Sequence, residues 1–146
     1  MIYLKPYVDK DYIAIKNYFP QKEIDKNVNR GKYRILSVLR LYKSHYYLLW
    51  DDDRVIGCGV VRWKWSREIH QFGWWLYSIW IHPAYRGKGI SKTLMNKLIT
   101  EVKAKNTKKV YLVVAKNNFV AKNLYNKIGF IKINENQSNE IMSYDL

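Results

Sequence analysis

A short stretch rich in glycine and cationic side chains separates two ordered patterns in the sequence. Residues 86–89, Arg-Gly-Lys-Gly, follow an apolar run that ends at Ile81 and precede a helical pattern that begins at Ile90. Glycine lets the backbone turn tightly, so that several N–H groups point at one place, and the helix that follows adds its positive dipole end. The stretch therefore predicts a phosphate-binding loop.

Two familiar nucleotide-binding loops do not match this stretch. A P-loop requires the spacing G-x-x-x-x-G-K-[ST], which the sequence does not contain. The dinucleotide fingerprint G-x-G-x-x-G requires a third glycine at the position that Lys92 occupies. The phosphate-bearing ligand is therefore expected to be held in a different way.

The elements around the loop alternate between strand and helix patterns. The clearest is the helix that begins at Ile90, in which Leu94, Leu98 and Val102 recur every four residues. The expected elements are a strand at 2–4, helices at 10–19 and 32–43, strands at 46–50, 55–65 and 74–81, a helix at 90–104, a strand at 108–115, a helix at 118–127, and strands at 130–133 and 140–146. This order predicts an α/β (α+β) fold, with a mixed sheet and helices on its faces.

Length and composition fit one soluble domain over residues 1–146. Cys58 is the single cysteine, so no disulfide framework and no cysteine-based zinc site are expected, and no metal is assigned. No apolar run is long enough to span a bilayer, and the N-terminus lacks a signal-peptide layout. A cytoplasmic location without membrane contact is expected.

The net charge of +14 is unevenly distributed. Residues 86–132 contain twelve Lys or Arg residues and one acidic residue, Glu101, so this segment carries eleven of the fourteen excess positive charges. Such a field favours anionic partners, namely phosphates, a nucleotide-bearing cofactor, nucleic acid or an acidic surface. Many of these lysines are also compatible with ordinary solvated helix faces.

A second motif lies about thirty residues after the loop. Asn118 is followed seven residues later by Tyr125, and then by the pair Gly129-Phe130. Together with the loop, which reads [QR]-x-x-G-x-[GA] apart from its last position, Ser91, this motif resembles the GNAT-superfamily N-acetyltransferases. The serine is small, and its hydroxyl could cap the helix or bind phosphate.

The resemblance implies a GNAT-like mixed, mostly antiparallel sheet that splays between its fourth and fifth strands, with helices on both faces. It also implies acetyl-CoA as acyl donor and, as acceptor, a primary amine of a small molecule or of a protein. The backbone of the fourth strand would hold the pantetheine arm and the thioester, and the loop would hold the pyrophosphate. The residues that the resemblance assigns to the cofactor are Ile79, Trp80, Ile81, Arg86, Gly87, Lys88, Gly89, Ile90, Ser91, Lys92 and Asn118.

Tyr125 is the catalytic candidate that the resemblance implies, because its hydroxyl would protonate the departing thiolate. Without that context, a tyrosine in an amphipathic helix is more often a core aromatic. Asn118 has an equally plain alternative as a helix cap, and it can be both cap and ligand.

The general base is not assigned by the sequence. An amine with a lysine-like pKa is about three units above neutral pH, so its free form costs roughly 4 kcal/mol to reach. The strands at 74–81 and 108–115 contain no carboxylate, which leaves Glu68 and His70 as candidates, if their loop at 66–72 folds over the site. A water held by backbone carbonyls, or an acceptor with a low amine pKa, would serve equally well. Cys58 lies in an expected strand and is not favoured as a nucleophile.

The acceptor is indicated only by composition. Five tryptophans cluster in the strands before the loop, and those that are not buried could form an aromatic wall: Trp63, Trp65, Trp74, Trp75 and Trp80. Arg62, Lys64 and Arg67 add positive charge, which favours an anionic acceptor such as a sugar nucleotide. Two alternatives remain open: an acetyltransferase that acts on aminoacyl-tRNA, and a non-catalytic module that binds CoA or nucleic acid. Exposed aromatic strands could also mediate a homodimer.

Overall fold

The structure is a computed structural model that describes residues 1–11, 13–14 and 43–146. Most of the first helix expected from the sequence, at 10–19, and almost all of the second, at 32–43, lie outside the described residues. What is described near them is a short 3-10 turn, η1 (Asp9–Asp11), and the start of β2 at Lys43.

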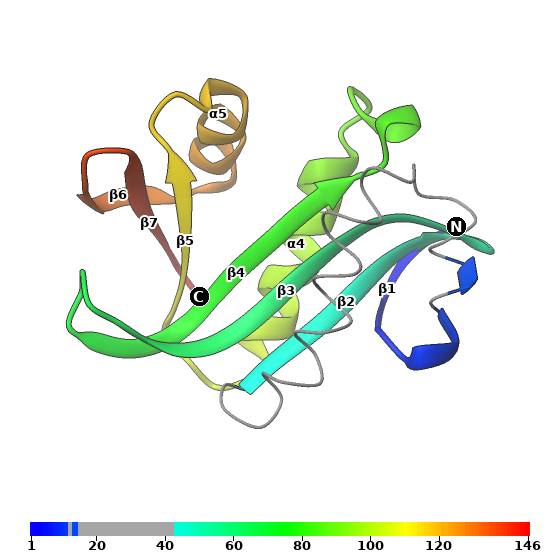
Figure 1. Cartoon of the computed structure of the whole chain (residues 1–146), viewed down its shortest axis with the longest axis horizontal. Helices are drawn as coiled ribbons and strands as arrows, with labels where there is room; N and C mark the ends of the chain where they lie inside the picture. The colour runs from blue at the N-terminus through cyan, green and yellow to red at the C-terminus, as the bar shows by residue number, and fades with distance from the viewer. Residues whose placement is uncertain (12, 15–42) are drawn as a thin grey trace.

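The described strands form one sheet in the order β1-β2-β3-β4-β5-β7-β6 (Figure 1). Their bounds are β1 (Ile2–Pro6), β2 (Lys43–Asp51), β3 (Arg54–Ser66), β4 (Gln71–Ile81), β5 (Lys109–Ala115), β6 (Ile131–Glu135) and β7 (Asn139–Asp145). Neighbouring strands are antiparallel, with the exception of the parallel pair β4–β5. This confirms the mixed, mostly antiparallel sheet.

The parallel pair is short, and this is what opens the sheet. β4 and β5 pair only from Trp74 to Leu76 and from Val110 to Leu112, although β4 continues to Ile81 and β5 to Ala115. Beyond these three pairs β5 turns away from β4 toward α5 (Phe119–Ile128), as Figure 1 shows. The splay expected between the fourth and fifth strands is therefore present.

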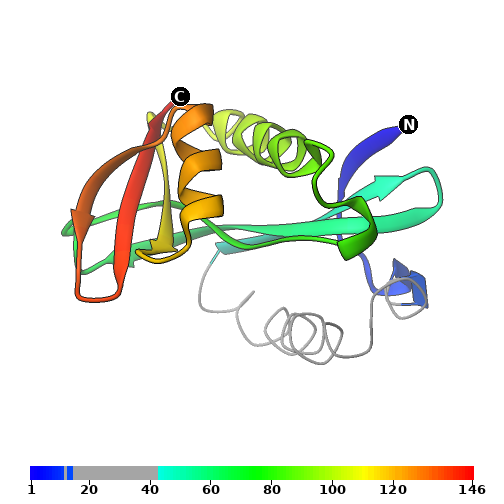
Figure 2. The same cartoon turned by 90° about the horizontal axis from the view of Figure 1, so that it is seen from above.

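Helix α4 (Ile90–Lys103) covers one face of the sheet, and α5 lies on the same side of it (Figure 2). The four-residue recurrence of α4 is confirmed, because its apolar stripe is buried and Lys92, Asn96 and Lys103 are exposed. The buried residues of α4 are Leu94, Met95, Leu98, Ile99 and Val102. Burial of such side chains contributes about 1.5–3 kcal/mol each, so packing against the sheet fixes α4 in place.

The opposite face of the sheet carries two smaller apolar clusters. One is centred on Leu48, Trp50 and Val55, and the other on Trp75, Tyr111 and Ile141. No helix in the described part of the chain has the length and apolar character needed to cross a membrane.

Candidate functional site

A β-bulge changes the register of the last residues of β4 against β3. The β3–β4 register shifts between Cys58, which pairs with Trp80, and Val60, which pairs with Tyr77. Ser78 absorbs the shift with a φ of 52°, a left-handed conformation that costs an L-residue of this kind roughly 1–2 kcal/mol. A bulge of this kind bends its strand locally, and this one lies directly beyond the last β4–β5 pair, where the two strands separate.

Two glycines of β3 permit this bend to pack closely. A Cβ at Gly59 would lie 2.5 Å from Cδ1 of Leu98 in α4, and a Cβ at Gly57 would lie 2.8 Å from the carbonyl oxygen of Trp80. Both distances are shorter than real Cβ atoms show, so a larger residue at position 57 would have to displace the backbone of β4, and one at position 59 would have to displace the buried side chain of Leu98. The distance between β3 and the end of β4 therefore depends on glycine.

The residues expected to hold the pantetheine arm, Ile79, Trp80 and Ile81, lie beyond the bulge. No residue of β5 in the described chain pairs with them, so this edge of β4 faces the splay. The carbonyl oxygen of Ile81 already accepts a hydrogen bond from Nε of Arg86, at 2.8 Å. The carbonyl oxygen of Trp80 points toward β3, because it lies 2.8 Å from a Cβ built on Gly57. The backbone edge that remains available at the splay is therefore that of Ile79.

The expected phosphate loop begins after a short 3-10 turn, η3 (Pro83–Tyr85). Gly87 and Gly89 have φ values of 75° and 76°, and no heavy atom lies within 4 Å of a Cβ built on either. Gly89 is also the N-cap of α4, and it has no side chain to occupy the helix end. The loop is therefore exposed, open and held in a backbone conformation that glycine adopts without strain.

Several N–H donors converge at this helix end. Among the described residues, none accepts a hydrogen bond from the N–H groups of Gly87, Lys88 or Gly89. The first N–H groups of α4, on Ile90 and Ser91, lack intrahelical partners by the geometry of any helix, since the first bond closes from Thr93 to Gly89. These donors and the helix dipole make an anion-binding site.

The cationic side chains of the loop mainly support its shape. Besides its bond to Ile81, the Arg86 guanidinium lies 5.7 Å from the centre of the Trp80 ring. Lys88 Nζ donates to the carbonyl oxygen of Ala84, at 3.3 Å, and Lys92 is exposed. All three cations remain close enough to the helix end to attract a phosphate.

His82, which the sequence reasoning did not single out, fastens the start of the loop. Its Nδ1 accepts a hydrogen bond from the N–H of Ala84, at 3.0 Å, and its own N–H donates to the carbonyl oxygen of Ile56, at 2.8 Å. Tyr85 adds a hydrogen bond from its hydroxyl to Asp51, at 3.3 Å. These contacts attach the loop to the β2–β3 hairpin, and only the His-Pro pair at the end of the apolar run could have indicated them.

Asn118 and Tyr125 lie on α5, on the other side of the splay. Oδ1 of Asn118 accepts a hydrogen bond from the N–H of Ala121, at 3.2 Å, so Asn118 is the N-cap of α5. Tyr125 is half-buried, packs against the core shared with Ile79, and lies 6.0 Å from Phe130 between ring centres. Burial raises the pKa of Tyr125 above its ordinary value, so its phenol keeps its proton at neutral pH.

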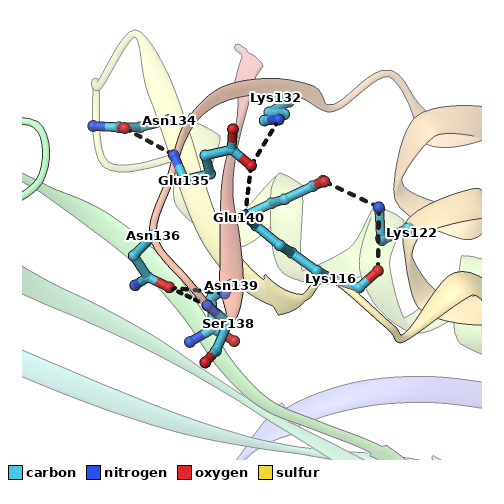
Figure 3. A network of polar contacts seen from close by, with 9 residues as sticks. All are labelled: Lys116, Lys122, Lys132, Asn134, Glu135, Asn136, Ser138, Asn139 and Glu140. Carbon is cyan, nitrogen blue, oxygen red and sulfur yellow. Dashed lines mark hydrogen bonds and ion pairs between the residues drawn. The ribbon is translucent and has the colours of Figure 1, made fainter.

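A polar network fixes the segment that leads into α5 (Figure 3). Lys122 of α5 pairs with Glu140 of β7 at 3.0 Å and donates to the carbonyl oxygen of Lys116 at 3.4 Å. Lys116 in turn pairs with Glu135 of β6 at 2.9 Å. The network attaches the β5–α5 connection, which carries Asn118, to the β6–β7 hairpin.

Glu68 and His70 are not brought to this site. They lie in the tip between β3 and β4, at the start of β4, whereas the bulge and the loop lie at its end. Gln71 and Ile81 are ten positions apart along β4, a length of about 33 Å. Hydrogen bonds from the backbone and from Ser66 lower the pKa of Glu68, which makes it a weaker base. Neither residue serves as the base in this geometry.

Cys58 is equally unsuited to chemistry. Its thiol donates to the carbonyl oxygen of Ser78 at 3.5 Å, and burial raises its pKa to about 12. The thiolate is therefore scarce at neutral pH. Among the described residues, no three His, Cys, Asp or Glu side chains gather as a metal site.

The tryptophans divide between core and surface. Trp74 and Trp75 are buried, Trp63 and Trp80 are half-buried, and Trp65 is 52% exposed. Trp65 lies at the β3–β4 tip, against the exposed Phe72, and not at the splay. The aromatic wall expected beside the acceptor is therefore not formed by Trp65.

Comparison with known proteins identifies relatives of the chain. The model of the acetyltransferase (GNAT) family matches residues 10–130. The chain is 30% identical over 87 residues to a mycothiol acetyltransferase from Corynebacterium glutamicum, which covers 60% of this chain and 28% of that protein. It is 41% identical over 58 residues to a ribosomal protein bS18 alanine N-acetyltransferase from Haemophilus influenzae, which covers 40% of this chain and 39% of that protein.

The chain thus spans 28% and 39% of the lengths of these two relatives. A solved structure of spermidine N-acetyltransferase from Vibrio cholerae, in complex with CoA and spermine, superposes with a TM-score of 0.72 at 21% identity. This alignment covers 99% of this chain and 95% of the other, so the two proteins share their fold over nearly the whole length.

Proposed function

Because the chain belongs to the acetyltransferase (GNAT) family, we propose that it transfers an acetyl group from acetyl-CoA to a primary amine. The observation that carries this proposal is the open loop with two left-handed glycines at the N-terminus of α4, next to the splay between β4 and β5. A phosphate-bearing donor with a long, narrow arm fits such a loop and slot together.

The donor would bind in two parts. The N–H groups from Gly87 to Lys92 would hold the pyrophosphate, with Arg86 and Lys88 beside it. The backbone of Ile79, which faces the splay, would pair with the pantetheine arm next to Trp80 and Ile81, and Asn118 would contact the arm from the other side of the splay. Asn118 keeps its side-chain amide for this contact while its Oδ1 caps α5.

The reaction would be a direct transfer. The amine nitrogen attacks the thioester carbonyl carbon, the C–N bond forms, the C–S bond breaks, and the thiolate takes a proton. Tyr125 would supply that proton, since burial raises the pKa of its phenol and keeps it protonated until the thiolate forms. The proton lost by the amine would pass to water, because no described carboxylate is placed to receive it.

The binding step is tested by calorimetric titration of acetyl-CoA into the purified protein. Binding of one molecule per chain, with competition by CoA, is the expected result. A folded protein that gives no binding heat over the micromolar to millimolar range would contradict the proposal.

Two further expectations belong with this proposal. The cytoplasmic location rests on the single cysteine and stays a prediction, as does a homodimer. An aminoacyl-tRNA acceptor is favoured by the net charge of +14 alone. Nucleic acid that co-purifies and is released by salt would favour that acceptor, or a binding module without activity, over a small amine.

A further inference from the structure

Two half-buried cations stack on aromatic rings on the sheet face opposite α4. The guanidinium carbon of Arg62 lies 4.9 Å from the centre of the Tyr77 ring. Nζ of Lys64 lies 4.5 Å from the centre of the Trp75 ring and 5.2 Å from that of Tyr77. The β3–β4 register pairs Arg62 with Trp75, so the four side chains lie next to one another on one face.

Arg62 is held in one orientation. Its Nε donates to Oγ of Ser44 at 2.9 Å, and Ser44 is 2% exposed. The two terminal nitrogens of the guanidinium donate to no described acceptor, and none of the ion pairs in the described chain includes Arg62 or Lys64. Stacking on Tyr77 orients the guanidinium, but it leaves the two terminal nitrogens without the carboxylate or phosphate that a guanidinium binds best.

These cations lie at the mouth of the splay. Tyr77 immediately precedes the bulge at Ser78, and the position on β5 next to it is Val113, one residue beyond the last β4–β5 pair. Val113 is 40% exposed although it lies in the middle of a central strand. The described residues therefore leave the sheet uncovered beside Tyr77, where the backbone edge of Ile79 begins.

We propose that this surface binds the acceptor, and that the acceptor is a small primary amine that carries a carboxylate or a phosphate. The oxyanion would lie on the terminal nitrogens of Arg62 with Lys64 beside it, and the amine would reach the thioester at Ile79. Tyr77 and Ile79 are two residues apart, about 7 Å along the strand, so a linker of a few bonds connects the two groups. The inference rests on the proposed acetyltransferase function.

The same surface disfavours polyamines. A diamine would bring a second positive charge next to Arg62 and Lys64, in a protein whose net charge is already +14. Repulsion between these like charges would weaken the binding of a diamine at this surface. The similarity to a spermidine N-acetyltransferase therefore extends to the fold and not to this acceptor.

The test compares amines that differ in one terminal group. The carboxylate arm pairs 4-aminobutyrate with 1-aminobutane and 1,4-diaminobutane, and the phosphate arm pairs O-phosphoethanolamine with ethanolamine. The rate of CoA thiol release gives kcat/KM for each. We expect kcat/KM for each anionic amine to exceed that for its uncharged match, the amine that lacks the anionic group, by about tenfold or more, which is the effect of a hydrogen bond to a charged group. The diamine should have the lowest kcat/KM. The faster arm identifies the preferred oxyanion.

Variants of Arg62 then locate the effect. Arg62→Met is expected to lower kcat/KM for the anionic amines about tenfold or more and to leave their uncharged matches within about twofold. Arg62→Lys keeps the charge but loses the planar guanidinium, so its kcat/KM for the anionic amines should lie between those of the wild-type protein and Arg62→Met. Arg54→Met, at the exposed start of β3, removes the same charge eight positions away from Arg62 and should change neither rate.

Each result has one meaning. Equal kcat/KM for anionic and uncharged amines in the wild-type protein, or an equal loss in Arg54→Met and Arg62→Met, would overturn the inference and leave the acetyltransferase function intact. Absence of acetyl-CoA binding by calorimetry would instead refute the function. If acetyl-CoA binds and no amine reacts, binding of each amine is measured instead by quenching of tryptophan fluorescence with CoA present. Saturable quenching by the anionic amines supports the inference. Quenching only by the amines that lack an anionic group, or by no amine at all, contradicts it.

Discussion

Substitution of Gly89 by glutamate separates ligand binding from folding more sharply than any other change in the loop. Gly89 has a φ of 76°, and no heavy atom lies within 4 Å of a Cβ at this position. The side chain therefore meets no steric obstacle, and the left-handed backbone costs roughly 1–2 kcal/mol. A carboxylate at the N-terminus of α4 returns about 0.3–1 kcal/mol through the helix dipole. The difference between these two terms is the net loss of stability, and each kcal/mol of it should lower the melting temperature by only about 2–4 °C.

The effect on acetyl-CoA should be far larger. A carboxylate about 5 Å from the pyrophosphate, at an effective dielectric constant of about 20, costs roughly 3 kcal/mol for each unit of charge. This corresponds to a loss of about two orders of magnitude in affinity, which calorimetry measures directly.

Two matched variants separate the causes. Gly89→Ala carries the backbone strain without the charge and should bind within about tenfold of the wild-type protein. Asn96→Glu places the same charge on the exposed side of α4, about 10 Å along the helix, where salt screens most of it. Affinity of a folded Gly89→Glu protein within about threefold of the wild type, or equal losses in Gly89→Glu and Asn96→Glu, would refute the assignment of the loop to phosphate.

Three other changes test neighbouring parts of the account. Tyr125→Phe should lower kcat about 100-fold and leave acetyl-CoA affinity and the melting temperature unchanged, whereas full kcat in the variant would contradict the acid role. Because the pKa of Tyr125 is raised, deprotonation of this residue should cause no loss of wild-type activity below about pH 10. Glu140→Gln leaves the partly buried Lys122 without its carboxylate and should destabilise the fold by about 1–2 kcal/mol in urea titrations, with recovery when Lys122→Met is added; no change in either protein would mean that the pair is only a surface contact. Gly59→Ala should cost about 1–3 kcal/mol, because its Cβ would lie 2.5 Å from Cδ1 of Leu98, and an unchanged melting temperature would show that α4 can move aside.

The ends of the two described helices were predictable from the sequence. Glycine at position 89 before an apolar recurrence predicts the start of α4, and Gly129 predicts the end of α5, where its φ is 122°. Asn118 was expected to cap α5, and its Oδ1 does so. These features depend on a few neighbouring residues, so a linear sequence contains the information that they require.

The bulge at Ser78 was not predictable, although it shapes the site. Serine has no marked preference for a left-handed φ, and its conformation follows from the register of β3 against β4. The same reason explains the role of His82, whose partner, Ile56, becomes its neighbour only when the β3–β4 hairpin is formed. Contacts between strands decide these features.

Glu68 and His70 illustrate a further limit. The sequence does not show whether their loop folds over the site or away from it. The structure shows that β4 is eleven residues long, which puts this loop at the end of β4 opposite the site. The cation pair of Arg62 and Lys64 was visible in the sequence as charge only. That both stack on Tyr77 follows from the strand register, which no local pattern determines.

The transfer of an acetyl group is the central claim, and mass spectrometry of the reaction mixture tests it most directly. The protein is incubated with acetyl-CoA and the amine panel, with Tyr125→Phe as the parallel control. The account predicts an amine whose mass rises by one acetyl group, in step with the release of CoA, and a much slower reaction in the variant. Binding of acetyl-CoA with no acetylated amine from either protein, over long incubation and across the anionic and uncharged amines, would contradict it.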